Sequence, residues 1–296
     1  MKILIIGARG FIGSYAYHFF SKDHQVWGAD ILTSGDTNFF LLNRLNTDFN
    51  EIFKTEQFDL CLNASGNGSV PVSINNPLLD FELNVNNTIK ILDAIRINNP
   101  QCKYIHLSSA AVYGNPVSLP VTENMALKPL SPYGWHKLYA EQICKEYFSL
   151  YNTASIMLRI FSVYGENLKK QLFWDIYQKT LQSKNIELFG TGNETRDFIY
   201  IQDLMQAINC IIDKGMFNGG AINVSSGIET TIKDAAEIFC TSLNKETTVT
   251  FNKITKPGDP LNWKADISLL TNLGFKNNTS IETGLKSTGK WLKENI

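Results

Sequence analysis

The 296-residue chain has few of the features that mark a specialised cellular setting. Its five cysteines are odd in number and widely scattered, so they match neither a disulfide framework nor a zinc-binding spacing, and we expect reduced thiols in a cytoplasmic protein. The formal net charge of −1 provides no attraction for nucleic acid or an anionic membrane, and we expect neither as a partner. The N-terminal apolar run of residues 3–6 is too short for a signal peptide or a membrane span.

Long hydrophobic runs, repeats and low-complexity segments are also missing from the sequence. The chain is 44% hydrophobic and 19% charged, which is typical of a globular protein. Its length is sufficient for one large α/β domain, or for a main domain with a smaller lobe.

What the chain does contain is a glycine-rich turn near its N-terminus. Residues 3–6 predict a strand buried on both faces of a parallel sheet, and Gly7, Gly10 and Gly13 follow it at intervals of three. Gly7 permits a tight turn, Gly10 lets the backbone approach a pyrophosphate, and Gly13 lets the next helix pack closely on the strand. Asp30, at the end of the second strand, can accept hydrogen bonds from ribose hydroxyls.

The alternative is a turn that serves packing alone and binds no ligand. Packing needs only one glycine, whereas three glycines are costly in backbone entropy. The N-terminus of the following helix also favours phosphate, because its free amides and its dipole attract negative charge. The turn therefore predicts a dinucleotide site.

Strand and helix patterns alternate through the first half of the chain. We predict strands at 58–62, 103–107 and 154–160, and helices at 77–98 and 133–151. The apolar face of the helix at 77–98 consists of Phe81, Val85, Ile89, Leu92 and Ile95. Repeated strand–helix units predict an α/β fold, a Rossmann-type doubly wound parallel sheet with right-handed crossovers.

The second half of the chain has a more interrupted pattern, with shorter segments at 186–189, 196–201, 232–243 and 284–293. We predict a dinucleotide-binding domain over residues 1–165, to which some later segments return. Residues 166–296 are expected to form a smaller, partly discontinuous C-terminal lobe. Ligands of such sheets bind at the carboxyl ends of the strands, so we expect the lobe to bind the substrate.

A second candidate site combines Tyr133 and Lys137, which lie four apart on a predicted helix and so share one face. A lysine ammonium near a phenol favours the phenolate, so the phenol can act as general base or acid nearer neutral pH. Ser109 ends the preceding strand, and Ser131 and Pro132 end the loop just before the helix. The alternatives are a surface tyrosine–lysine pair and an ordinary serine at a strand end.

Together these motifs resemble the extended short-chain dehydrogenases/reductases, and within them the NAD-dependent nucleotide-sugar epimerase/dehydratase family that includes UDP-glucose 4-epimerase-like proteins. The resemblance extends over nearly the whole chain. Its landmarks in this sequence are Gly7-x-x-Gly10-x-x-Gly13, Asp30, Asn63-Ala-Ser65, Asn84-Val-Asn-Asn-Thr88, Ser108-Ser-Ala-Ala-Val-Tyr-Gly114, Ser131-Pro-Tyr133-x-x-x-Lys137, Leu158-Arg-Ile-Phe-Ser-Val-Tyr-Gly165, Gly190-Thr-Gly-Asn-Glu-Thr-Arg-Asp197 and Pro257-Gly-Asp259.

The resemblance implies a role for each matching residue. Ser109 and Tyr133 would hydrogen-bond the sugar hydroxyl that is oxidised, Tyr133 would take its proton, and Lys137 would bind the nicotinamide ribose and lower the tyrosine pKa. The cofactor would be bound by Gly7, Arg9, Gly10, Phe11, Ile12, Gly13, Asp30, Ala64, Asn84 and Lys137. The nucleotide sugar would be bound by Ser109, Tyr133, Ser162, Gln171, Arg196 and Lys256.

Arg196 would hold the diphosphate of the nucleotide sugar. That role suits one of only five arginines in the chain, because a planar, bidentate donor matches phosphate geometry. The alternative for Arg196 is a salt bridge with Asp197 or Asp203.

The two residues after Ser109 distinguish reactions within the family. Related dehydratases have an aspartate and a glutamate there, decarboxylases have a glutamate at the second position, and 3,5-epimerases have a cysteine at the second position. Here Ala110 and Ala111 stand at both, so no side chain can supply a second proton transfer. We expect a 4-epimerase that acts through a 4-keto intermediate with tightly bound NAD. The alternative is an NAD(P)H-dependent reductase of a nucleotide 4-keto-6-deoxysugar.

Arg9 keeps the reductase alternative open. In resembling reductases an arginine in the glycine turn contacts the 2′-phosphate of NADP, whereas Asp30 repels that phosphate, so we expect NAD with NADP as the alternative. Ser162, Gln171 and Lys256 also depart from the usual family residues, and these departures weaken the epimerase interpretation as Arg9 does. A third hypothesis is a cofactor-sensing regulatory protein without catalysis, which would be expected to have lost Tyr133 or Lys137. Family precedent predicts a homodimer.

Overall fold

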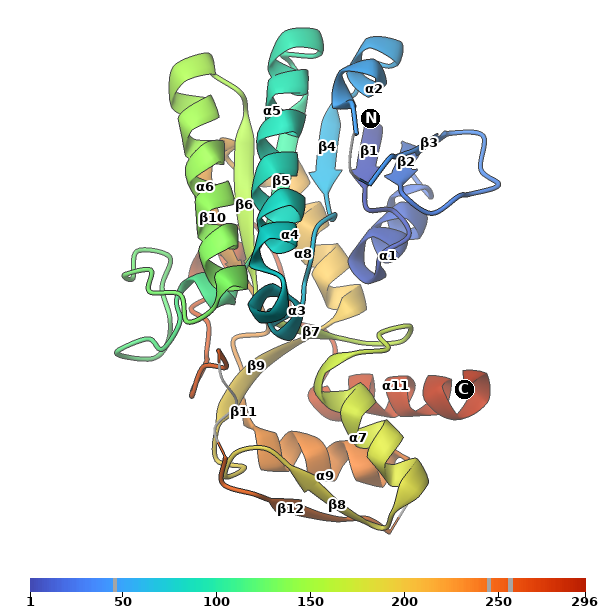
Figure 1. Ribbon diagram of the computed structural model, residues 1–296, viewed down its shortest axis with the longest axis vertical. Coiled ribbons are helices and arrows are strands. Elements are labelled where there is room, and N and C mark those ends of the chain that lie inside the picture. The colour runs from blue at the N-terminus through green and yellow to red at the C-terminus, as the bar shows by residue number, and fades with distance from the viewer. Residues whose placement is uncertain (45–46, 244–245, 255–257) are drawn as a thin grey trace. The chain divides into compact units, whose positions relative to one another are not determined.

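The computed structural model describes residues 1–44, 47–243, 246–254 and 258–296. The chain forms two compact units, whose elements are labelled in Figure 1. The first unit contains Met1–Gly114, Leu127–Ile160 and Ile211–Ile222, and the second contains Asn115–Ala126, Phe161–Cys210 and Asn223–Ile296. The domain boundary expected after residue 165 stays a prediction.

A seven-stranded sheet organises the first unit, with the strand order β10-β6-β5-β4-β1-β2-β3. The pairs β1–β2, β2–β3, β1–β4, β4–β5 and β5–β6 are parallel. The strands are β1 (Lys2–Ile6), β2 (Gln25–Asp30), β3 (Phe39–Leu41), β4 (Leu60–Asn63), β5 (Lys103–Ser109), β6 (Ser155–Ile160) and β10 (Asn218–Val224). The expected α/β fold with a Rossmann-type, doubly wound parallel sheet is confirmed.

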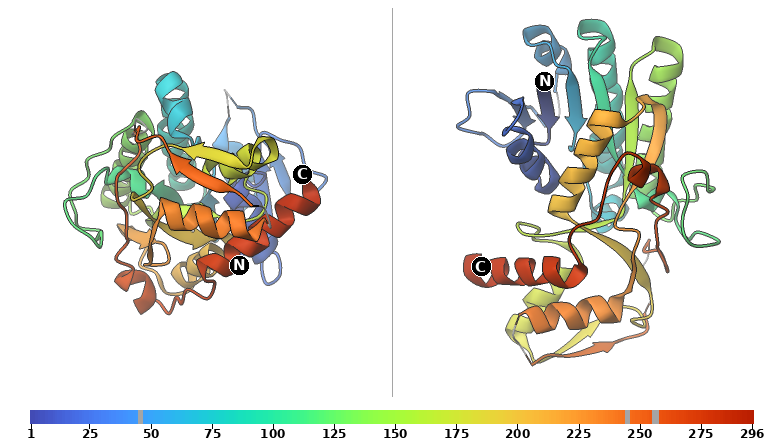
Figure 2. Two further views of the ribbon diagram at one scale, coloured as in Figure 1. Left: turned by 90° about the horizontal axis from the view of Figure 1, so that it is seen from below. Right: turned by 180° about the vertical axis from the view of Figure 1, so that it is seen from behind.

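Helices cover both faces of this sheet. They are α1 (Phe11–Phe20), α2 (Phe49–Thr55), α3 (Val70–Asn75), α4 (Pro77–Phe81), α5 (Asn87–Asn98) and α6 (Pro132–Tyr151), with a π-helical turn η1 (Glu82–Asn86) and a 3₁₀ turn η2 (Ala110–Val112). From β1 the strand order runs one way to β2 and the other way to β4, β5 and β6, so right-handed crossovers put α1 on one face and α5 and α6 on the other. Figure 1 shows α5 and α6 in front of the sheet, and the right-hand view of Figure 2 shows α1 on the opposite face.

The carboxyl ends of the parallel strands gather the candidate site residues at one edge of the sheet. β1 leads into Gly7, β2 ends at Asp30, β4 ends at Asn63 and β5 ends at Ser109. The strands themselves are deeply buried, since all four residues at 3–6 are 0% exposed. Burial on both faces of the sheet therefore fixes where these polar residues leave the core.

The helix predicted at 77–98 differs in the structure, because the π-helical turn η1 divides it into α4 and α5. A π turn contains one more residue than an α turn, so the residues before it are rotated relative to those after it. Phe81, expected on the buried face, is 36% exposed, whereas Asp80 is 0% exposed. The predicted burial of Phe81 is wrong, and a carboxylate lies inside in its place.

The second unit contains two small sheets and several helices. One sheet has the order β11-β9-β7 and the other pairs β12 with β8. Its elements are β7 (Ser162–Tyr164), α7 (Gln171–Gln182), β8 (Asn185–Leu188), β9 (Thr195–Tyr200), α8 (Ile201–Lys214, whose last residues count with the first unit), β11 (Glu229–Thr231), α9 (Ile232–Ser242), β12 (Thr248–Phe251), α10 (Ser268–Asn272) and α11 (Ile281–Asn295). An aromatic cluster forms its core, with contacts among Tyr164, Phe173, Phe198, Tyr200 and Phe239.

Two further observations concern the whole described chain. None of its helices is long and apolar enough to cross a membrane within residues 1–44, 47–243, 246–254 and 258–296. All five cysteines are described, and none of them forms a disulfide within the described part of the chain.

Candidate active site

The glycine-rich turn has the geometry that its spacing predicts. Gly7 has a φ of +83°, and a Cβ there would lie 2.7 Å from the backbone of the loop after β4. A Cβ on Gly13 would lie 2.0 Å from the Gly7 carbonyl oxygen, so only glycine lets α1 pack this closely on the turn. Gly10 precedes α1, and no side chain caps the helix there. The amides at the start of α1, those of Phe11 and Ile12, are therefore available to an anion.

Asp30 lies beside this turn at the end of β2. One carboxylate oxygen accepts from the backbone N–H of Arg9 at 2.9 Å, and the other accepts from that of Leu32 at 3.1 Å. The guanidinium of Arg9 donates to the Thr33 carbonyl at 3.3 Å and lies 6.0 Å from the centroid of the Phe39 ring. The Asp30 carboxylate is thus fixed to the glycine turn by backbone donors.

Ala64 and Asn84 lie in the segments that follow β4. The N–H of Ala64 donates to the Ile6 carbonyl at 2.8 Å, which extends the β1–β4 pairing. Asn84, in the π-helical turn, is 2% exposed, and its Nδ2 donates to the Asn67 carbonyl at 3.2 Å and to Asp80 at 3.1 Å. Among the residues that the structure describes, its Oδ1 has no hydrogen-bond partner. Such a buried, unpartnered acceptor is an exception that needs an explanation.

The structure brings Ser109, Tyr133 and Lys137 together. Ser109 ends β5, its Oγ accepts from the Ala111 N–H at 3.2 Å, and it is hydrogen-bonded to the Tyr133 phenol in the first turn of α6. Lys137 is 5% exposed, and its Nζ donates to the Leu107 carbonyl at 3.0 Å and lies 5.9 Å from the centroid of the Tyr133 ring. The alternative of a surface tyrosine–lysine pair is wrong, because the lysine is buried.

Burial is the largest influence on the pKa of both groups. It raises the pKa of the Tyr133 phenol, which the hydrogen bond with Ser109 opposes. It lowers the pKa of the Lys137 ammonium to about 8, although the charges of Asp80 and Glu141 act to raise it. We expected the pKa of the Tyr133 phenol to be lowered toward neutral pH. In the structure it is raised, because the loss of hydration on burial outweighs the hydrogen bond with Ser109.

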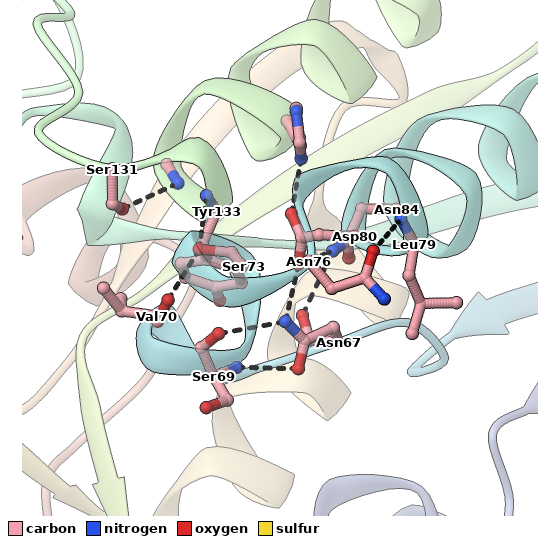
Figure 3. A network of polar contacts seen from close by, with 12 residues as sticks. Asn67, Ser69, Val70, Ser73, Asn76, Leu79, Asp80, Asn84, Ser131 and Tyr133 are labelled. Carbon is pink, nitrogen blue, oxygen red and sulfur yellow. Dashed lines mark hydrogen bonds and ion pairs between the residues drawn. The ribbon is translucent and has the colours of Figure 1, made fainter.

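Small residues hold the start of α6. The Ser131 Oγ caps the helix by accepting from the Gly134 N–H at 3.2 Å, and the Ser73 Oγ on α3 accepts from the Tyr133 N–H at 3.0 Å. A Cβ on Gly134 would lie 2.7 Å from the carbonyl oxygen of Ala111. Figure 3 shows Ser73 against the start of α6. Ser131 at the N-cap and Pro132 at the first helical position form a signal that the sequence shows, whereas Ser73 is distant in sequence and gives no such signal.

A buried acid next to these residues was not found from the sequence. One oxygen of the Asp80 carboxylate accepts from Asn67 Nδ2 at 2.6 Å and from Asn84 Nδ2 at 3.1 Å (Figure 3). The other is paired with Nδ1 of His136 at 2.5 Å. His136 directly precedes Lys137 on α6. Asp80 was missed because regular helical spacing assigns its position to the exposed face.

Arg196 lies on β9 of the second unit. Its guanidinium donates to the carbonyls of Thr195 and Leu261 at 2.8 and 3.2 Å and lies 5.5 Å from the centroid of the Trp263 ring. Burial lowers its pKa, and Asp259 raises it. Carbonyls use only part of the guanidinium, which has five N–H donors.

Neither carboxylate considered as a salt-bridge partner for Arg196 lies within ion-pair distance of it among the described residues. Asp197 instead accepts from Ser225 at 2.6 Å and from the Ala265 N–H at 2.9 Å. Asp203 accepts from the Thr279 N–H at 3.0 Å. The salt-bridge alternative is wrong, because both carboxylates have other donors.

Three substrate residues expected from the resemblance are also in the second half of the chain. Ser162 begins β7 and is half-buried opposite Phe198 of β9. Gln171 begins α7, is exposed and has a φ of +68°. Lys256 lies outside the described residues. The structure therefore describes Ser162 and Gln171 within one unit, and their roles stay predictions.

Comparison with known proteins identifies the same family over most of the chain. Residues 3–225 match the model of the NAD dependent epimerase/dehydratase family. The UDP-glucuronate 4-epimerase of Thermodesulfobacterium geofontis is 28% identical over 99% of this chain and 96% of its own length. The UDP-glucose 4-epimerase of Mycolicibacterium smegmatis is 29% identical over 79% and 80% of the two chains.

Solved structures agree with the sequence relatives. The UDP-glucuronic acid 4-epimerase of Bacillus cereus, in complex with UDP-glucuronic acid and NAD, superimposes with a TM-score of 0.91 at 28% identity and full coverage of both chains. A UDP-N-acetylglucosamine 4-epimerase from Methanobrevibacter ruminantium superimposes with a TM-score of 0.89 at 27% identity over 100% and 99% of the chains. The chain is therefore an enzyme that belongs to the NAD-dependent epimerase/dehydratase family.

Proposed function

We propose that the enzyme is a nucleotide-sugar 4-epimerase that keeps NAD bound and uses Tyr133 as its general base and acid. The observation that carries the proposal is the contact of Ser109 with Tyr133 on the same edge of the sheet as the glycine turn, in a chain that matches UDP-sugar 4-epimerases over its full length. The relatives support the nucleotide-sugar substrate, and the side chains support the mechanism.

The residues at the sheet edge fit NAD. The turn at Gly7 and Gly10 leaves backbone amides free for a pyrophosphate, and the Asp30 carboxylate beside it can accept from ribose hydroxyls. Asn84 adds a buried acceptor without a partner among the described residues. NAD, when bound, supplies the acceptor and later the donor of the hydride at the sugar C4.

Tyr133 removes the proton of the C4 hydroxyl and later returns it. Ser109 hydrogen-bonds the same hydroxyl and keeps the phenol oxygen aimed at it. Because burial raises the pKa of Tyr133, the phenol needs positive charge nearby to act as a base, and both Lys137 and an oxidised nicotinamide carry it. Inversion requires the 4-keto sugar to turn its other face to the cofactor before reduction.

Ala110 and Ala111 support simple redox chemistry at one carbon. Water elimination needs a second acid–base pair beside the reacting sugar, and methyl side chains cannot transfer protons. Arg196 is proposed to bind the substrate diphosphate, since no carboxylate of the described residues lies within ion-pair distance of its guanidinium, which can still donate.

The test is turnover of a panel of nucleotide sugars by the purified enzyme. UDP-glucose, UDP-galactose, UDP-glucuronic acid, UDP-N-acetylglucosamine and a nucleotide 4-keto-6-deoxysugar are each incubated without added cofactor and, in parallel, with NADH or NADPH. The products are separated by chromatography. Interconversion of one C4 pair supports the proposal. Strict dependence on added NADH or NADPH, with conversion only of a 4-keto-6-deoxysugar nucleotide, supports the reductase and contradicts the epimerase.

A further inference from the structure

The Asp80 carboxylate is the centre of a buried hydrogen-bond network in the first unit. It is 0% exposed and has three side-chain partners: Asn67, Asn84 and His136. These partners come from the loop after β4, from the π-helical turn and from α6. Figure 3 shows Asp80 between the loop and helix segments, with Asn67 and Asn84 directed at it. A buried carboxylate is costly, so three donors at one group indicate a built arrangement.

The chemistry of the carboxylate determines how Asn84 is oriented. An ionised carboxylate only accepts hydrogen bonds, and so does the Asn67 carbonyl, so both groups require the Nδ2 side of the Asn84 amide. The opposite side of the amide, Oδ1, is then directed away from both. Turning the amide over would leave two acceptors facing an oxygen, which is unfavourable in a buried site.

The unpartnered Oδ1 is buried close against Gly66, in room that only glycine leaves for it. A Cβ on Gly66 would lie 2.5 Å from the Asn84 Oδ1, and Gly66 has a φ of +106°. Gly66 belongs to the loop after β4, whose Ala64 and Ser65 backbone lies within 2.7 Å of a Cβ built on Gly7 of the phosphate-binding turn. The unpartnered oxygen therefore lies by the loop that packs on the cofactor turn.

We propose that Asp80 is a positioning residue of the cofactor site, which fixes the Asn84 amide so that its Oδ1 accepts a hydrogen bond from bound NAD. The group recognised is a donor of NAD, namely a ribose hydroxyl, the nicotinamide amide or the adenine amino group, because the phosphates only accept. This proposal rests on the cofactor role of Asn84 that belongs to the proposed function. It does not depend on which sugar is converted.

The π-helical turn explains why an acid can do this here. Asp80 precedes the turn and Asn84 is inside it, and both are buried, at 0% and 2% exposure. Without the extra residue of the π turn, the helix would direct the neighbouring Phe81 inward, as its sequence period predicts. Residues four apart are neighbours in any helix, and here the π turn leaves both the carboxylate and the amide on the buried side.

The test is a double-mutant cycle on NAD affinity, measured by calorimetric titration of NAD. Asp80→Asn lets residue 80 donate as well as accept, so only the Asn67 carbonyl still requires the Nδ2 side of Asn84. The amide is then held less firmly in one orientation, and we expect the Kd for NAD to rise roughly tenfold. Asn84→Ala should raise it by a similar factor. If Asp80 acts through Asn84, the double variant should bind within about twofold of Asn84→Ala alone.

Asn99→Ala provides the matched control. Asn99 is also a buried asparagine of the first unit, 4% exposed, and its Oδ1 accepts from the Phe58 N–H at 2.7 Å. This variant should lose stability in urea and keep its NAD affinity. Additive effects of Asp80→Asn and Asn84→Ala would overturn the proposal and leave Asp80 a purely structural group. Unchanged affinity in Asn84→Ala would overturn it as well.

A second measurement needs no variant at position 80. In the wild-type protein the Asn84 side-chain NH₂ protons, assigned in nitrogen-15 spectra by their loss in Asn84→Ala, should exchange slowly with solvent because both acceptors hold them. Fast exchange in the protein without NAD would overturn the proposal. If the epimerase assignment were wrong, the panel of nucleotide sugars would show it. The NAD affinities of the variants and the slow exchange of the Asn84 amide would still be as expected here.

Discussion

At the scale of single residues, Tyr133 is subject to opposing influences on its proton. Burial raises its pKa, while the hydrogen bond with Ser109 lowers it. Lys137, buried on the next turn of α6, donates to the Leu107 carbonyl. The proposed base is therefore a phenol whose ionisation depends on the positive charge gathered around it when substrate and cofactor are present.

Replacing the phenol hydroxyl tests its role most simply. Tyr133→Phe should lower kcat by about 10²- to 10⁴-fold, the usual contribution of a general base, while the Kd for NAD is unchanged. Tyr139→Phe is the matched control, since Tyr139 is on the same helix and is 44% exposed. Retention of more than about a tenth of the activity in Tyr133→Phe would contradict the general-base role.

The buried Lys137 ammonium makes stability depend on pH. Its pKa is about 8 in the folded protein, against an ordinary value of 10.5. Between these two pH values the unfolded chain binds more protons than the folded one. Burial of the charged ammonium therefore costs stability in full below pH 8, and this cost decreases as the pH rises above 8. Lys137→Met removes this penalty, and its stability relative to wild type should be more favourable at pH 7 than at pH 9.5 by about 2 kcal/mol.

Urea unfolding of wild type and Lys137→Met at the two pH values measures this difference. Lys145→Met is the control, because Lys145 is on the same helix and is only half-buried. A relative stability of Lys137→Met that is the same at pH 7 and pH 9.5 would show that the folded protein does not hold Lys137 with a lowered pKa.

Asp30 should decide between the two nicotinamide cofactors. Asp30→Ala removes a carboxylate that can accept from the ribose hydroxyls and repel a 2′-phosphate, so NAD binding should weaken by about 10- to 100-fold and the preference over NADP should relax. Titration with NAD and with NADP measures both constants. An unchanged preference would count against the ribose role and in favour of Arg9 as the selecting residue.

The individual site residues differ in how far the sequence reveals them. Gly7, Ser109 and Tyr133 were predicted because each sits in a short local motif at the end of a strand or start of a helix. Asp80 was not, since its burial depends on a π-helical turn and on partners such as His136, which is 56 residues away. Regular periodicity cannot predict a rotation that one inserted residue causes.

At the scale of elements, the start of α6 is positioned by close backbone contact. Gly134 lets the helix approach η2, the turn that follows Ser109, because a Cβ there would lie 2.7 Å from the Ala111 carbonyl oxygen and 2.9 Å from Pro129. The first turn of α6 carries Tyr133. The distance between the serine and the phenol therefore depends on the close approach that this glycine permits.

Gly134→Ala should destabilise the protein by about 1–3 kcal/mol, because the clash with backbone exceeds the gain in helix propensity. It should also lower kcat with little change in NAD affinity, since the glycine turn is untouched. Gly35→Ala is the control, because a Cβ there meets nothing within 4 Å. A Gly134→Ala enzyme with wild-type stability and kcat would show that α6 does not need this close approach.

At the scale of the whole molecule, the sheet was predictable and much of the second unit was not. The strand at 3–6 is a continuous apolar run, which is typical of a buried parallel sheet, and the strands expected at 3–6 and 103–107 are both confirmed. Short elements such as β7 and β11 have three residues each, too few for a period to be read. The homodimer and the cytoplasmic location stay predictions.

The central claim is that hydride leaves and returns to the same sugar carbon without exchange with added cofactor. The most direct measurement uses the nucleotide sugar that the panel identifies, deuterated at C4, incubated with the purified enzyme alone. We predict that the C4 epimer forms and keeps its deuterium at C4, as mass spectrometry and proton NMR of the product would show. Loss of the deuterium from the product, or conversion only when reduced cofactor is added, would contradict the account.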